Sequence, residues 1–97
     1  MKALEEIKKI LAEHKGELED KFKVKEIGVF GSYVRGEQQK QSDVDILVEF
    51  YEPVGLFKFI ELEDYLEKLL KIKVDVVSKK ALKPHIGEHI LREVVYA

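Results

Sequence analysis

Residues 24–50 read VKEIGVFGSYVRGEQQKQSDVDILVEF, and this stretch decides the fold. Its first part, Val24 to Phe30, is apolar and β-branched, which predicts a strand that runs directly into Gly31 and Ser32. The following residues are polar and leave room for one short helical turn. Val44 to Phe50 then predicts a second strand. The stretch therefore predicts two strands joined by a glycine turn and a polar loop.

The flanking sequence predicts helices around these strands. Apolar residues at helical spacing indicate an amphipathic helix from Met1 to about Lys15, which ends near Gly16 and covers a sheet. A second helix is expected from Leu56 to Leu70 and a third strand from Ile72 to Val77. Pro84 suits the first position of a last helix. One face of that helix carries Ile86, Ile90, Leu91 and Val94. This order predicts the α/β (α+β) class, a small mixed sheet flanked by helices, in a single domain over residues 1–97.

Composition narrows the classes of function. The chain has 97 residues, a formal net charge of −2 and no cysteine. The charge gives no general reason to expect binding to nucleic acid or to a membrane surface, and the absence of cysteine excludes disulfides and thiolate metal sites. No apolar run is long enough to cross a membrane, and the first ten residues are too acidic for a signal peptide. We therefore expect a cytoplasmic protein.

Three aspartates stand where aspartate is usually depleted. The chain has 5 Asp among its 19 acidic residues, and Asp43, Asp45 and Asp75 fall on predicted strands. Asp43 and Asp45 project to one face about 7 Å apart, and Asp75 on a neighbouring strand could complete a cluster. Three close carboxylates stay ionised together when a divalent cation lies among them, and aspartate suits Mg²⁺. The alternative is that Asp43 and Asp45 only lie at a frayed strand start, with Ser42 and Asp43 as turn or capping residues.

The glycine turn and the aspartates have a recognisable spacing. Gly31-Ser32 is followed by ten residues, then Asp43-Val44-Asp45, and by a distant Asp75. This pattern resembles the signature of the polymerase-beta-like nucleotidyltransferase superfamily. With Arg35-Gly36 included, residues 31–50 are similar to the minimal nucleotidyltransferase (MNT) family of prokaryotes, whose members are commonly paired with a HEPN-domain partner. The resemblance extends over nearly the whole chain and implies the polymerase-beta-like nucleotidyltransferase fold.

The resemblance also implies an activity and residues that carry it. Family members transfer a nucleoside monophosphate, typically AMP from ATP, to an acceptor hydroxyl. It implies that Gly31 and Ser32 bind the phosphates, and that Asp43 and Asp45 hold two Mg²⁺ ions, with Mn²⁺ as a substitute. Asp75 would bind the catalytic metal and orient or deprotonate the acceptor. Arg35 would contact the nucleotide phosphates, although a structural pair with a nearby acidic residue is an equal alternative for it.

Partners follow from the same resemblance. It implies an antitoxin that binds ATP and adenylylates a hydroxyl, that of a tyrosine, on a HEPN-domain toxin. The net charge and the lack of a long apolar run predict no direct contact with nucleic acid or a membrane. The small size of the chain favours a homo- or hetero-oligomer, because a bare catalytic domain must obtain much of its acceptor site from the acceptor. The alternative is a non-catalytic antitoxin that neutralises its partner by occlusion.

Overall fold

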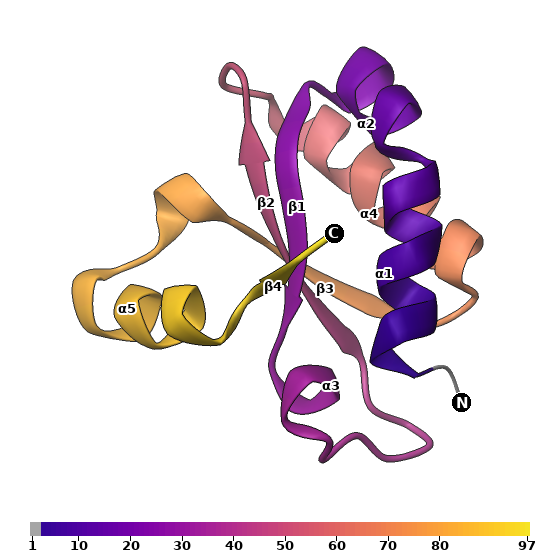
Figure 1. Cartoon of the computed structure of the whole chain (residues 1–97). Coiled ribbons are helices and arrows are strands. Elements are labelled where there is room, and N and C mark those ends of the chain that lie inside the picture. The colour runs from indigo at the N-terminus through magenta and orange to yellow at the C-terminus, as the bar shows by residue number, and fades with distance from the viewer. Residues whose placement is uncertain (1–2) are drawn as a thin grey trace.

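The computed structural model describes residues 3–97 and contains a four-stranded sheet with helices on both faces (Figure 1). Met1 and Lys2, at the start of the expected first helix, lie outside the described residues. The elements in chain order are α1 (Leu4–Glu13), α2 (Lys15–Phe22), β1 (Val24–Phe30), α3 (Ser32–Arg35), β2 (Val44–Phe50), α4 (Leu56–Leu70), β3 (Val74–Ser78), the 3-10 turn η1 (Lys79–Ala81), α5 (Pro84–Glu93) and β4 (Val95–Tyr96).

The sheet is mixed, as the sequence predicts, and its strand order is β3-β2-β1-β4. β1 and β2 are antiparallel neighbours, β4 pairs antiparallel with the other edge of β1, and β3 runs parallel to β2. The end of β1 and the starts of β2 and β3 therefore meet at one end of the sheet.

The main core lies between one face of the sheet and the helices α1, α2 and α4 (Figure 1). Alternate residues of the strands point into it because strand side chains alternate between the two faces. α4 contributes Leu62, Leu66 and Leu70, which lie one helical turn apart and are fully buried. The strands contribute Val24, Ile27, Val29, Val44, Ile46, Val48, Val74 and Val76.

The opposite face of the sheet is covered less completely, by α5 (Figure 1). A second, small cluster forms there, in which Ile90 of α5 packs with Phe30 of β1 and Leu47 of β2. Asp45 lies two residues before Leu47 on the same strand, so its side chain projects to this same face. The carboxylates thus emerge on the thinly covered face, away from the main core.

Three details of the helices differ from the sequence expectation. The first helical segment is interrupted at His14 and continues through Gly16, because the backbone at His14 leaves the helical region while its ring bonds to the Ile10 carbonyl oxygen. α5 starts at Pro84 as predicted but ends at Glu93. Ile90 of its predicted apolar face is buried, whereas Ile86 and Leu91 are exposed.

No helix within residues 3–97 is both long enough and apolar enough to span a lipid bilayer.

Candidate active site

The candidate active site lies where β1 ends and β2 and β3 begin. Asp45 is paired with Phe30 across the antiparallel β1–β2 ladder and with Asp75 across the parallel β2–β3 ladder. Asp45 and Asp75 are therefore neighbours on one face of the sheet. Asp43 is exposed and lies one residue before β2, which corrects the expectation that it is a strand residue.

Gly31 brings the backbone against the Asp45 carboxylate. Its φ of +79° and ψ of −150° lie in a region that residues with a Cβ rarely adopt. A Cβ at this position would also collide with the carboxylate of Asp45. Glycine is thus required twice at this turn, by the backbone conformation and by the close approach of an acidic side chain.

The short helix α3 begins directly after this glycine. Val34 and Arg35 donate their amides to the Gly31 carbonyl oxygen, and the buried side chain of Tyr33 anchors the turn in the main core. Ser32, the first residue of α3, stays half-buried next to the turn. The sequence prediction of one short helical turn is confirmed here, and it places Ser32 beside the Gly31–Asp45 contact.

Negative charge around Asp45 is not fully compensated. Burial raises the pKa of the Asp45 carboxyl, and the nearby carboxylates of Asp75 and Asp43 raise it further, while Arg35 opposes them. Within residues 3–97, neither Asp45 nor Asp75 takes part in a hydrogen bond or an ion pair. Such a donor set has the chemistry that a divalent cation requires.

The carboxylates do not form a closed set of ligands. Across the described part of the chain, no three His, Asp or Glu side chains come close enough together to hold one metal ion. Asp45 and Asp75 are adjacent through the sheet register, whereas Asp43 stands outside the strand on the exposed side of the turn. The residues therefore fit a cation by charge and by atom type, and the carboxylate face remains open.

The raised pKa of Asp45 predicts a stability that depends on pH. The folded protein binds this proton more tightly than the unfolded chain, so the ionised carboxylate destabilises the fold above the raised pKa. We expect Asp45→Asn to raise the melting temperature of the metal-free protein by a few degrees near neutral pH. The gain should vanish below the ordinary pKa of aspartate. Thermal melts in EDTA across the acidic range test this, and a lower melting temperature at neutral pH would contradict it.

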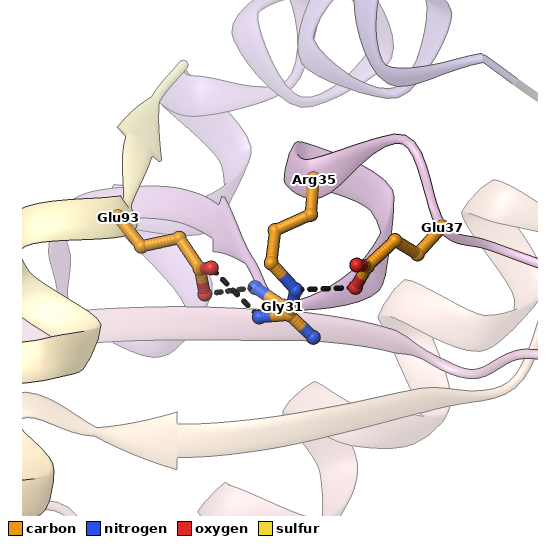
Figure 2. Close-up of polar contacts among 4 residues, drawn as sticks. All are labelled: Gly31, Arg35, Glu37 and Glu93. Atoms are coloured by element: carbon orange, nitrogen blue, oxygen red, sulfur yellow. Dashed lines mark hydrogen bonds and ion pairs between the residues drawn. The ribbon is translucent and has the colours of Figure 1, made fainter.

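Arg35 is held between two carboxylates (Figure 2). Its Nε donates to Glu37 at 2.6 Å and its Nη1 donates to Glu93 at 2.7 Å. The second oxygen of Glu93 accepts the Gly31 amide at 2.7 Å. The structural alternative for Arg35, an acidic partner, is therefore realised, and its expected role toward a nucleotide stays a prediction.

Glu93 is the residue of this site that sequence reasoning missed. Burial alone would raise its pKa, but the hydrogen bonds from Arg35 and Gly31 hold the pKa of the Glu93 carboxyl below its ordinary value. The Glu93 carboxyl therefore stays ionised beside the turn.

Ser42 has the turn role that the sequence suggested, because its hydroxyl accepts a hydrogen bond from the Gln39 amide and its own amide donates to the Gln39 carbonyl oxygen.

The sequence matches known proteins over almost its full length. A profile of the nucleotidyltransferase domain family covers residues 11–97. The protein adenylyltransferase MntA of Thermococcus cleftensis is 62% identical over 96 residues, which are 99% of this chain and 97% of that protein. A Methanocaldococcus jannaschii protein assigned as a protein adenylyltransferase is 56% identical over 97 residues, 99% of either chain.

Solved structures agree with these sequence matches. A minimal nucleotidyltransferase aligns with a TM-score of 0.74 at 35% identity, covering 92% of this chain and 93% of that one. One chain of a toxin–antitoxin complex crystallised with AMP-PNP aligns with a TM-score of 0.73 at 26% identity. That alignment covers 88% of this chain and 69% of the other. The four-stranded mixed sheet with flanking helices is thus the fold of minimal nucleotidyltransferases.

Proposed function

Because this chain belongs to the nucleotidyltransferase domain family, as a minimal nucleotidyltransferase of the protein adenylyltransferase type, we propose that it transfers AMP from ATP to a hydroxyl of a HEPN-domain toxin. In this proposal the acceptor is a tyrosine and the modification silences the toxin. The relative crystallised with AMP-PNP in a toxin–antitoxin complex supports both ATP as the substrate and a toxin as the partner.

The observation that carries the proposal is the contact between the glycine turn and the paired carboxylates. Gly31 approaches the Asp45 carboxylate so closely that no Cβ fits, and Asp45 lies beside Asp75 in the sheet. A phosphate group bound at the turn would therefore lie next to two carboxylates, which are ligands for the cations that accompany ATP. Nucleotidyl transfer requires this combination of an anion site and a cation site.

Each residue has a proposed role in this reaction. Asp45 and Asp75, which are paired in the sheet, and the exposed Asp43 would share two Mg²⁺ ions, or Mn²⁺ in their place, and these ions when bound would neutralise the charge of the phosphates. Gly31 lets the backbone come close to the phosphates, and the Ser32 hydroxyl donates to them. Arg35 provides a planar cation on the same side of the turn.

The chemical step joins the acceptor to the α-phosphorus of ATP. The acceptor oxygen attacks this phosphorus, its bond to the pyrophosphate oxygen breaks, and pyrophosphate leaves. Asp75 is proposed to orient the acceptor hydroxyl and to take its proton. Asp75 is exposed at the start of β3, so an acceptor held on another protein can reach it.

A covalent mechanism predicts a toxin that stays silent after the antitoxin is gone. We expect incubation of a HEPN toxin from the same organism with this protein, ATP and Mg²⁺ to add the mass of one or more AMP groups to the toxin. After the two proteins are separated, the toxin should remain inactive, because a covalent bond persists when a complex dissociates. Mass spectrometry and a toxin activity assay measure the two effects.

The Asp75→Asn variant provides the control for this experiment. It keeps the size of the side chain and should still bind the toxin, but we expect neither a mass change nor lasting inactivation. If Asp75→Asn neutralised the toxin as well as the wild type, with activity returning on separation in both cases, neutralisation would be occlusion and the enzymatic proposal would be wrong.

A further inference from the structure

Glu93 connects two parts of the chain that are far apart in sequence. One carboxylate oxygen accepts the Gly31 amide at 2.7 Å, and the other accepts Arg35 Nη1 at 2.7 Å (Figure 2). Only 11% of the Glu93 side chain is exposed. Because both oxygens are hydrogen-bonded and the side chain is largely shielded from water, the Glu93 carboxylate is held in one orientation. It therefore also orients the Gly31 amide and the Arg35 guanidinium that donate to it.

The place of Glu93 follows from the pairing of β1 with β4. Gly28 pairs with Tyr96 and Val29 with Val95 in an antiparallel ladder. If the same register is continued beyond the ends of β1 and β4, Glu93 lies opposite Gly31. The backbone at Glu93 is already helical, so its side-chain carboxylate takes the Gly31 amide that a strand neighbour would otherwise bind.

We propose that Glu93 is a positioning residue of the nucleotide site. Its carboxylate holds the Gly31–Ser32 turn and the Arg35 guanidinium in the arrangement that receives the phosphates of ATP. Glu93 does not touch the phosphates in this proposal, because its own negative charge would repel them. The inference rests on the proposed function, which assigns the nucleotide to this turn.

The second partner of Arg35 provides a comparison within the same site. Glu37 accepts Arg35 Nε at 2.6 Å, but 63% of its side chain is exposed. Exposed ion pairs contribute little, since water and salt screen them. The side chain of Glu37 makes no described contact with Gly31. The backbone amide of Glu37 does donate to the Ser32 carbonyl oxygen of the turn, but that bond does not depend on the side chain, so a change of the Glu37 carboxylate affects only Arg35.

The decisive variant is Glu93→Gln, which keeps the shape of the side chain. Glutamine offers one acceptor oxygen where glutamate offers two, so either Gly31 or Arg35 must face the amide NH₂ group. We expect the Kd for MgATP to rise about tenfold, as for the loss of a hydrogen bond to a charged group. Calorimetric titration of the purified protein, well below its melting temperature, measures this without an acceptor.

Two further variants make the titration specific. Glu88→Gln makes the same charge change on the exposed surface of α5 and should leave the Kd unchanged. Glu37→Gln removes only an exposed partner of Arg35 and should change the Kd less than about threefold. This order of effects, largest at Glu93, would support a positioning role through Gly31.

Other results would overturn the inference. A lower melting temperature with an unchanged Kd in Glu93→Gln would show a purely structural role. Equal losses in Glu93→Gln and Glu37→Gln would assign the effect to the charge of Arg35 alone, and tighter binding would show that Glu93 competes with the phosphates. These three results leave the proposed function intact, whereas failure of the wild-type protein to bind MgATP would overturn both.

Discussion

Asp45→Asn is expected to lower the rate of AMP transfer about a thousandfold, which corresponds to the several kcal/mol that metal-assisted charge neutralisation contributes to such reactions. Asp45 is the aspartate in the middle of the site, paired with Asp75 through the sheet and in contact with the Gly31 turn. Asparagine keeps the shape of the side chain and removes the charge that a cation needs. Steady-state assays with saturating ATP, Mg²⁺ and toxin measure the loss.

Asp20→Asn is the matched control for this substitution. Asp20 is exposed on α2, and the main core separates that helix from the carboxylates. The Asp20→Asn variant should transfer AMP at the wild-type rate. Because Asp45→Asn is expected to melt at a higher temperature than the wild type when metal is absent, unfolding cannot explain its loss of activity. Full transfer by Asp45→Asn, or wild-type transfer in EDTA, would contradict the assignment.

Gly31→Ala is expected to lower the free energy of unfolding by at least about 2 kcal/mol, since the positive φ alone is costly for a residue with a Cβ. The added methyl group must also displace the Asp45 carboxylate, which lies where the Cβ would be placed. AMP transfer should therefore fall together with stability. Chemical denaturation and the transfer assay measure the two losses.

Gly36→Ala is the comparison at a second glycine with a positive φ, which lies in the ordinary left-handed region and has no contact with Asp45. Gly36 also has a positive φ, of +72°, but a Cβ there would meet nothing within 4 Å. We expect it to cost only about 1 kcal/mol, as for one residue in the left-handed region, and to retain transfer. If Gly31→Ala and Gly36→Ala lowered the free energy of unfolding and the rate of AMP transfer equally, the contact between Gly31 and Asp45 would contribute to neither.

Local pattern was sufficient for most of the fold. β1 and α4 begin and end at the predicted residues, and β2 ends at the predicted Phe50, because strong apolar periodicity is bounded by glycine, proline or polar residues in each case. Pro84 likewise marks the start of α5. The mixed sheet followed from the order of these elements.

The remaining elements depend on contacts that the local sequence does not encode. Gly16 carries the usual signal for a helix end, yet it lies exposed within α2, and the break falls at His14 instead. β4 is only two residues long and exists because Val95 and Tyr96 pair with β1. In the sequence these residues continue the apolar pattern of the preceding helix.

In the candidate site too, some residues could be predicted from the local sequence and others depend on distant contacts. Asp45 and Asp75 could be predicted because aspartates stand out on strands, and their adjacency follows from the parallel register. Glu93 could not be predicted, since it is one of many glutamates on a helix and its partners are 58 and 62 residues away. The open arrangement of Asp43 also depends on the loop before β2, which has no regular pattern.

The alternation of β2 has a consequence for errors in strand pairing. Asp45 lies between Val44 and Ile46, both of which are fully buried in the main core. If β2 turned over by one residue, the carboxylate of Asp45 would enter the apolar core and the two aliphatic side chains would move toward solvent. A strand paired in the wrong register would therefore be destabilised by burial of Asp45, a residue of the candidate site. A chain that folds stably therefore presents Asp45 on the open face of the sheet. The register that stabilises the fold is also the register that places this carboxylate in the candidate site.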